Sequence, residues 1–413
     1  MQTQSQVNFR QVFSLPVIVA ALGYFVDIYD LVLFSIVRVP SLKSLGFSGQ
    51  ELIDNGVFLL NMQMAGMLIG GIIWGVLGDR KGRLAIMFGS IFLYSIANLA
   101  NGLADSLPAY AALRFVAGIG LAGELGAGIT LVAEILPKAI RGYGTMLVAS
   151  VGVSGAILAN LVATAFDWRM AFFIGGGLGL LLLITRISVA ESGMFQAMGK
   201  KSAVSRGNFL ALFTDRQRFV RYLNSIAIGI PIWFVVGVLI TFSPEFAKSL
   251  GTTGPVSAGN AVMLCYLGLI FGDFSSGLLS QALKSRKKVI LLFMLLIMAG
   301  IGLYFLQGSQ SPAFFYGVCC FLGFAGGYWA IFVTVAAEQF GTNLRATVAT
   351  TVPNFVRGMV VPITTLFQLG RGYFSLEASA LLVGSFCLLV ALIALAGLEE
   401  TFHKDLDYFE EFP

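Results

Sequence analysis

Twelve runs of apolar residues set the strongest limit on how this chain folds, because each can cross the roughly 30 Å hydrocarbon core of a bilayer as a helix. Of the 413 residues, 57% are hydrophobic and 11% are charged, whereas about 25% of the residues in a soluble domain are charged. We therefore predict an all-α membrane protein with twelve transmembrane helices. Their ranges are 14–37, 56–77, 84–103, 108–134, 141–165, 169–188, 221–242, 258–283, 287–306, 312–338, 345–369 and 376–397.

The Lys and Arg residues predict the orientation of these helices. An even number of helices places both termini on one side of the membrane. If that side is the cytoplasm, 19 of the 26 Lys and Arg residues fall in cytoplasmic segments, Arg186 and Arg216 among them. We expect a multi-pass protein of the bacterial inner membrane with cytoplasmic termini. The net charge of +5 then reflects topology, and no nucleic-acid partner is expected.

The longest polar break divides the chain into halves that repeat. We predict a six-helix bundle over 1–190, a cytoplasmic linker with an interfacial amphipathic helix over 191–220, and a second bundle with a short tail over 221–413. Residues 119–134 align without a gap on residues 323–338, which pairs Gly123 with Gly327 and Glu134 with Glu338. Parallel repeats of this kind predict two pseudo-symmetric bundles with a site between them.

Three stretches resemble motifs of the major facilitator superfamily. Residues 75–83 contain glycine, Asp-Arg and then Gly-Arg, which is similar to the superfamily's signature loop between helices 2 and 3. Residues 23–30 and 114–142 resemble helix 1 and helix 4 of its metabolite:proton symporters and sugar porters. The resemblance implies gradient-driven transport by alternating access. The glutamine-rich helix 7 motif of sugar porters is absent from residues 228–242, and the glycine-proline motif of antiporters from residues 151–163, so sugars and antiported drugs are less expected.

Acidic residues in the N-terminal half are candidates for proton coupling, because an ionisable group at mid-membrane usually faces a partner or a wet cavity. Asp27 and Asp30 share one face of the first helix. Arg114 lies at a depth similar to that of Asp30, and the pair resembles the acid–arginine pair of proton-coupled sugar porters. We expect Asp27 or Asp30 to carry a proton and Arg114 to hold the unprotonated form, with a static ion pair as the alternative. Glu124 is either a second proton site or a structural acid.

Arg357 is the candidate for substrate binding, because it stands midway along the run 345–369. A guanidinium group can bind a carboxylate through two parallel hydrogen bonds. The alternative is an internal ion pair with Asp273, which lies at a similar depth. The remaining expected lining of the cavity is aromatic or carboxamide: Tyr24, Tyr29, Asn61, Gln63, Asn160, Trp233, Tyr328, Trp329 and Asn354.

Charged residues at the cytoplasmic helix ends are expected to be structural or gating groups. In the signature loop, Asp79 can lie against a helix N-terminus or pair with Arg83, beside Arg80. Glu134 and Glu338 each lie seven residues before an arginine, and we expect the pairs Glu134–Arg141 and Glu338–Arg345.

The function that these residues favour is secondary transport of a small organic anion, a carboxylate-type metabolite, together with protons. Alternatives are transport of a zwitterion such as a betaine or an amino acid, a metal exporter using Asp27, Asp30 and Asp273, or a sensor. We expect no enzyme activity and no cofactor. The single histidine, His403, lies in the tail and the four cysteines lie in apolar runs, so no metal site is expected. The expected partners are a small-molecule substrate, protons and lipid, with the protein a monomer.

Overall fold

The computed structural model describes residues 9–81, 83–136, 140–191, 209–404 and 410. Within helices it does not describe the side chains of residues 9, 78–81, 83–85, 127, 129–131, 133, 134, 141–143, 145, 187–191, 342 and 346.

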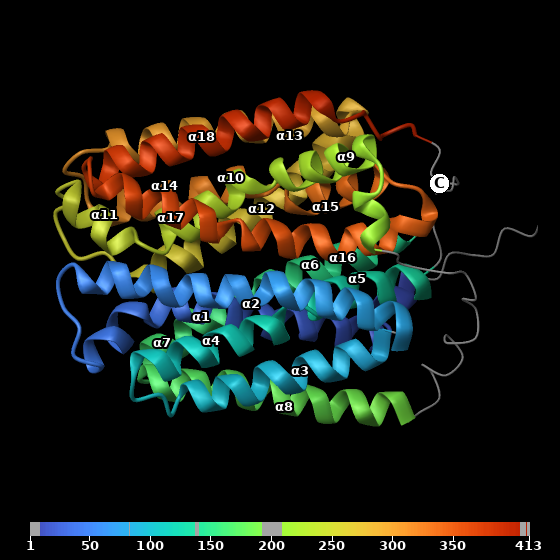
Figure 1. Ribbon diagram of the computed structural model, residues 1–413, viewed down its shortest axis with the longest axis horizontal. Coiled ribbons are helices and arrows are strands. Elements are labelled where there is room, and N and C mark those ends of the chain that lie inside the picture. The colour runs from blue at the N-terminus through green and yellow to red at the C-terminus, as the bar shows by residue number, and fades with distance from the viewer. Residues whose placement is uncertain (1–8, 82, 137–139, 192–208, 405–409, 411–413) are drawn as a thin grey trace, which may run out of the picture.

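Twelve helical rods form two six-helix bundles that lie side by side (Figure 1). The N-terminal bundle contains α1 (Leu15–Ser44), α2 (Glu51–Lys81), α3 (Arg83–Asn101), α4 with α5 (Leu107–Leu121 and Glu124–Ile135), α6 with α7 (Arg141–Val153 and Gly155–Ala165) and α8 (Trp168–Glu191). The C-terminal bundle contains α9 with α10 and η4 (Arg216–Ala227, Ile230–Phe234 and Val235–Ile240), α12 (Ala258–Leu283), α13 (Arg286–Leu306), α14 with α15 (Pro312–Gly326 and Trp329–Glu338), α16 with α17 (Thr342–Gly358 and Val360–Arg371) and α18 (Leu376–Gly397). The predicted all-α architecture is confirmed.

Several rods are broken in the middle, and the breaks repeat between the halves. The fourth rod breaks at Ala122–Gly123 and the tenth at Gly327–Tyr328, so the glycines that the repeat aligned stand at equivalent breaks. The fifth and eleventh rods break at Ser154 and Met359. In the described part of the chain, nine helices are long and apolar enough to span a membrane, and some of them, such as Pro312–Glu338, run across a break.

Glycines let the helices inside each bundle approach closely. A Cβ atom added to Gly118 of α4 would collide with the carbonyl of Gln63 in α2. In the C-terminal bundle, a Cβ atom on Gly323 of α14 would collide with the carbonyl of Cys265 in α12. Small residues at such contacts are the usual way for helices to pack in lipid, where the hydrophobic effect does not drive association.

The segment before α9 differs from the predicted interfacial helix. Residues Phe209–Phe213 form one short 3₁₀ helix, η3, and α9 begins at Arg216, before the predicted start at 221. The Asp215 side chain caps α9 by accepting the N–H of Arg218 at 2.7 Å, which satisfies an amide that has no acceptor within the helix. The rest of the predicted linker, residues 192–208, lies outside the described residues.

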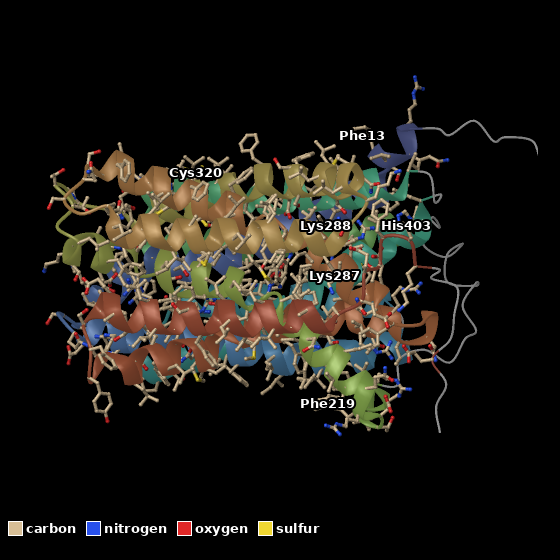
Figure 2. All side chains as sticks on the ribbon, turned by 90° about the horizontal axis from the view of Figure 1, so that it is seen from above. Phe13, Phe219, Lys287, Lys288, Cys320 and His403 are labelled. Carbon is tan, nitrogen blue, oxygen red and sulfur yellow. The ribbon has the colours of Figure 1, made fainter. Side chains whose placement is uncertain are left out.

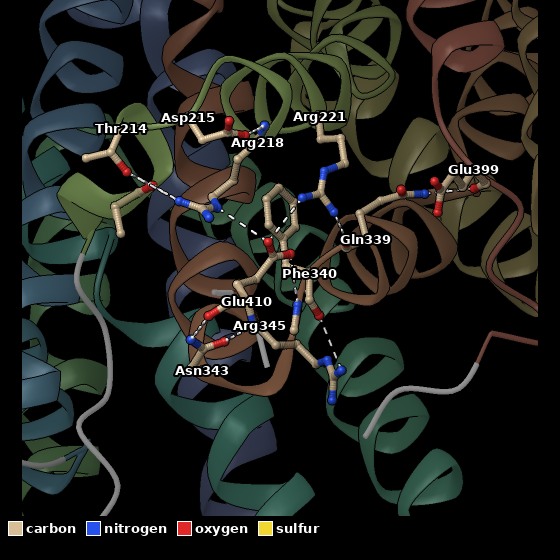
Figure 3. A network of polar contacts seen from close by, with 12 residues as sticks. Thr214, Asp215, Arg218, Arg221, Gln339, Phe340, Asn343, Arg345, Glu399 and Glu410 are labelled. Carbon is tan, nitrogen blue, oxygen red and sulfur yellow. Dashed lines mark hydrogen bonds and ion pairs between the residues drawn. The ribbon is translucent and has the colours of Figure 1, made fainter. Parts of the chain in front are cut away.

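The first and the last described residues lie at the same end of the bundles, which we call the tail end. Figure 2 shows Phe13, Lys287, Lys288 and His403 toward this end. Residues near the C-terminus dock on it: the carboxylate of Glu410 accepts from Arg221 at 3.1 Å and from Arg218 at 3.4 Å (Figure 3). Two hydrogen bonds, both 3.0 Å long, join Asn343 to the backbone of Glu410. The tail therefore ties the start of α9 to the turn between α15 and α16.

We predict that Glu410→Ala lowers the free energy of unfolding of the purified protein by about 1–3 kcal/mol, because buried donors of Arg218 lose a charged acceptor. The side chains of Glu410 and Arg218 are only 8% and 5% exposed. The control is Glu399→Gln, whose carboxylate is 64% exposed and pairs with Lys404. Thermal unfolding in detergent measures both variants. Equal effects of the two substitutions would contradict a specific role for Glu410.

Candidate functional site

An acid and an arginine from opposite bundles face each other in the middle of the structure. Asp27 of α1 and Arg357 of α16 are 0% and 1% exposed, and Nη1 of Arg357 lies 4.0 Å from Oδ2 of Asp27. Neither oxygen of Asp27 has a hydrogen-bond partner among the described residues. Nε and Nη1 of Arg357 have none either, within the same part of the chain. Arg357 therefore faces Asp27, and the alternative internal partner proposed from the sequence, Asp273, is not in contact with it.

Two indole rings flank the guanidinium group of Arg357. Its central carbon lies 5.7 Å from the ring centre of Trp233 in α10 and 5.8 Å from that of Trp329 in α15. The two indoles meet edge to face, with their centres 6.1 Å apart. Nε1 of Trp233 is buried and has no acceptor among the described residues. The centre of the protein thus combines a cation, aromatic surface and unused hydrogen-bonding groups.

Asp273 has a different environment. It lies in α12, and its Oδ1 accepts the backbone N–H of Ala330 at 3.1 Å, at the start of α15. The carboxylate is therefore engaged at the break in the tenth rod.

A second acid–arginine group lies inside the N-terminal bundle. Arg114 of α4 donates to Asn98 at 2.7 Å and to Gln63 at 3.3 Å, and its guanidinium group stacks on Phe172. In the described chain no hydrogen bond or ion pair joins Arg114 to Asp30: the two terminal nitrogens of Arg114 donate to amide side chains, and its Nε has no acceptor. Asp30 is fully buried, and neither of its oxygens has a hydrogen-bond partner in the described part of the protein.

Other residues expected to line the cavity are engaged elsewhere. The Tyr29 hydroxyl donates to the carbonyl of Ala171 at 2.9 Å, inside the N-terminal bundle. The Tyr328 hydroxyl donates to the carbonyl of Ile228 at 2.9 Å, inside the C-terminal bundle. Gln63 donates to the carbonyl of Leu31. These side chains support helices around the centre.

Two of the three expected asparagines join the bundles near the centre. Asn61 of α2 accepts from Thr364 of α17 at 2.6 Å. Asn354 of α16 donates to the carbonyl of Ala122 at 2.8 Å. Both contacts cross the interface on which Asp27 and Arg357 meet.

Glu124 is bound in a buried ion pair that the sequence analysis did not anticipate. Its partner is Arg186, which was assigned to a cytoplasmic loop but lies in α8 and is 3% exposed. Both nitrogens at the end of Arg186 donate to Glu124, and Arg186 also donates to the carbonyls of Met87 and Val19. A Cβ atom on Gly23 would collide with this pair. The loop assignment was wrong because Arg186 is the only charge near the end of this apolar run, and hydropathy does not say whether such a charge turns inward.

A third group closes the end of the bundles opposite the tail end, which we call the far end. Arg38 at the end of α1 is 0% exposed and donates to both oxygens of Glu245, at 2.6 and 2.7 Å. Glu245 lies in α11 (Ser243–Ser249) of the other half. The hydroxyls of Ser35 and Thr241 meet at 3.0 Å one turn deeper. Beside this contact a cavity of about 280 Å³ is lined by Asn160, Thr164 and Pro244 among others, so Asn160 does not lie at the centre.

The expected gating groups lie at the tail end. The side chains of Asp79, Arg80, Arg83, Glu134 and Arg141 lie outside the described residues. Glu338 pairs with Arg286 at 3.0 and 3.1 Å and accepts from the hydroxyl of Thr401, instead of pairing with Arg345. Arg345 donates to the carbonyl of Phe340. The described residues contain no group of three or more His, Cys, Asp or Glu side chains that could hold a metal ion.

Two repeated helical bundles with charged groups buried at their interface are typical of secondary membrane transporters. The model of the Major Facilitator Superfamily matches residues 20–365. The chain belongs to this superfamily, so it is a multi-pass membrane protein that transports a small molecule and is not an enzyme.

Relatives and solved structures agree with this assignment. The chain is 26% identical to a putative niacin/nicotinamide transporter of Bacillus subtilis, over 90% of this chain and 94% of the relative. It is 25% identical to a gentisate transporter of Corynebacterium glutamicum, over 67% and 68% of the two chains. The fold matches an inward-open structure of the xylose transporter from E. coli with a TM-score of 0.70 and 18% identity, covering 96% and 98% of the chains.

We predict that Arg186→Gln destabilises the protein by about 3–5 kcal/mol, because it leaves Glu124 buried without a cation. Adding Glu124→Gln to this variant should restore part of the loss. Unfolding in detergent measures both, with Asp105→Asn as the control, because Asp105 is 85% exposed in its pair with Arg169. Full stability of Arg186→Gln together with altered proton dependence of transport would assign Glu124 to proton coupling instead.

Proposed function

We propose that the protein is a secondary transporter that moves a small organic anion, a carboxylate-type metabolite, together with protons by alternating access. The observation that carries this proposal is the state of Arg357: it is buried between the bundles, and Nε and Nη1 have no acceptor among the described residues. Buried donors without acceptors are costly. A substrate carboxylate would supply two acceptors in the geometry that a guanidinium group favours.

The two indole rings favour a substrate acid that carries an aromatic or unsaturated group. Trp233 and Trp329 both lie within 6 Å of the guanidinium carbon of Arg357, so a carboxylate bound there would bring its attached group against them. One relative is named a putative niacin/nicotinamide transporter and another a gentisate transporter, and niacin and gentisate are aromatic carboxylic acids. An aromatic monocarboxylate would therefore use both the charge and the rings of this site.

In this proposal, proton coupling results from competition between Asp27 and the substrate carboxylate for Arg357. With no substrate bound, Asp27 is the acid that faces this cation, at 4.0 Å. A substrate carboxylate on Arg357 would leave Asp27 fully buried beside a second anion, and a buried acid in that position gains a proton. Anion and proton would then cross together. Asp30, also buried and without a hydrogen-bond partner in the described chain, is the second acid of this step, with Arg114 nearby on α4.

Contacts on both sides of Arg357 would open in turn. Arg38–Glu245 and Ser35–Thr241 join the bundles at the far end. On the tail-end side, Asn354, three residues before Arg357 in α16, joins the bundles at the carbonyl of Ala122. Rocking of one bundle against the other would break one set while keeping the other. The distribution of Lys and Arg favours cytoplasmic termini, and the bacterial relatives favour the inner membrane. We propose a monomer, since each chain contains both halves of the site.

A zwitterion is the second candidate, and the pairing of Asp27 with Arg357 favours it. The two unpartnered oxygens of Asp27 could bind an ammonium group while Arg357 binds the carboxylate of the same molecule. The substrate would then replace both members of the pair.

We predict that benzoate and nicotinate stabilise the detergent-purified protein, by about 2.7 kcal/mol at a hundred times Kd. Arg357→Gln should abolish this stabilisation because the guanidinium fork is lost. A matched control is Arg371→Gln, since Arg371 lies at the far end and pairs with an exposed Asp54. The measurement is the thermal unfolding temperature of the unsubstituted protein and of the two variants, each with and without ligand. Stabilisation by glycine betaine or an amino acid alone would favour the zwitterion, and stabilisation by sugars or divalent metals alone would contradict both proposals.

We predict that Asp30→Asn abolishes uphill accumulation of substrate in proteoliposomes but leaves substrate exchange, because exchange needs no net proton movement. The measurement is uptake of radiolabelled benzoate with and without an inward proton gradient. Asp105→Asn, an exposed acid in the same half, serves as the control. Uphill uptake retained by Asp30→Asn would remove Asp30 from the coupling step.

A further inference from the structure

The break in the tenth rod leaves backbone amides without an acceptor in their own helix, and one side chain supplies an acceptor. Between α14 and α15, Gly327 and Tyr328 leave the helix, so α15 begins at Trp329 in the middle of the rod. The first amides of a helix have no acceptor within it. Hydrocarbon provides no water to replace that acceptor. Oδ1 of Asp273 accepts the N–H of Ala330 at 3.1 Å, and a carboxylate is also favoured there by the helix dipole.

Close packing of α12 against α14 brings Asp273 to this position. A Cβ atom on Gly327 would collide with the backbone of Gly272, the residue before Asp273. The break is also held from the other side, where the Tyr328 hydroxyl donates to the carbonyl of Ile228 at 2.9 Å, next to the break between α9 and α10. Asp273 and Tyr328 thus fix the break from two neighbouring rods.

The residue that this arrangement orients is Trp329. Trp329 is the first residue of α15 and directly precedes Ala330, whose backbone N–H donates to Asp273. Its ring contacts Trp233 edge to face and lies 5.8 Å from the guanidinium carbon of Arg357. A shift of the start of α15 would move one wall of the central site while leaving Arg357 in α16 in place.

We propose that Asp273 is a positioning residue for the substrate site: by capping α15 it holds Trp329 beside Arg357, and it thereby sets the preference for substrates with an aromatic ring. Asp273 acts through its hydrogen bond, not as a proton carrier or an ion-pair partner of Arg357. The inference rests on the proposed function for its effect on substrate, but the cap itself does not depend on any substrate.

Asn and Ala substitutions separate the hydrogen bond from the charge. The side-chain oxygen of Asn accepts the same N–H, so Asp273→Asn keeps the cap, whereas Asp273→Ala removes it. Tyr328→Phe removes the support on the other side of the break and serves if Asp273→Ala does not fold. Ser275→Ala is the control, because the Ser275 hydroxyl bonds only to a carbonyl of its own helix.

The first measurement is hydrogen–deuterium exchange of peptides that cover residues 326–335, without substrate. Exchange should rise in Asp273→Ala and in Tyr328→Phe and stay native in Asp273→Asn and Ser275→Ala. The second measurement is the ratio of the Kd values for acetate and benzoate. That ratio should fall by up to about tenfold in Asp273→Ala, the size expected for loss of an aromatic contact with Trp329, and stay native in Asp273→Asn.

Each deviating result overturns a distinct claim. Native exchange in Asp273→Ala would show that Asp273 does not cap α15 and would end the proposal. Loss of benzoate preference or of uphill uptake in Asp273→Asn, with native exchange, would make the charge of Asp273 the functional feature instead. If the unsubstituted protein binds neither benzoate nor acetate, the proposed function fails, while the exchange data still decide whether Asp273 caps the break.

Discussion

Burying a charged group in a membrane protein requires acceptors or an opposite charge. The described part of the chain buries five arginines, and four of them, all but Arg218 at the tail end, lie along the helical rods of the two bundles. Arg38 has Glu245 and two carbonyls, Arg114 has Gln63 and Asn98, and Arg186 has Glu124 and two carbonyls. Arg357 differs, because within the described chain it has one distant acid and two indole rings. The first three hold helices together, although Nε of each also lacks an acceptor in the described chain; in our proposal, Nη1 of Arg357 is the group left for a substrate.

The two-fold repeat gives both halves a broken helix at the same position, and the halves use the break differently. In the N-terminal half, Glu124 follows Gly123 and is bound to Arg186, so that the start of α5 is tied to α8. In the C-terminal half, Tyr328 follows Gly327, and the acid near the start of α15 comes from α12 instead. This arrangement leaves an aromatic residue, Trp329, at the start of the helix that faces Arg357. The asymmetry concentrates the aromatic surface of the site in the C-terminal bundle.

Much of the architecture could be predicted because lipid limits the choices. The lengths of the apolar runs predicted the twelve rods, and the glycine repeat aligned the two positions at which the structure shows breaks. The choice of ionic partners could not be predicted in this way. Asp30 and Arg114 have similar depths, yet Arg114 binds amides, and Arg186 follows an apolar run but turns inward. Depth along a helix is a property of one segment, whereas the direction of a side chain depends on how each rod is rotated in its bundle.

The sequence by itself determined that this protein is a helical membrane protein in two repeated halves, with few ionisable groups at mid-depth, because the cost of exposing polar groups to lipid acts on each segment separately. Only the tertiary structure decided that Arg357 faces Asp27, that Asp273 caps a helix, and that two tryptophans meet beside Arg357. These contacts join residues as far apart as 27 and 357. They depend on helix rotation and on close approach at glycines, which packing of the whole bundle sets and no single segment encodes.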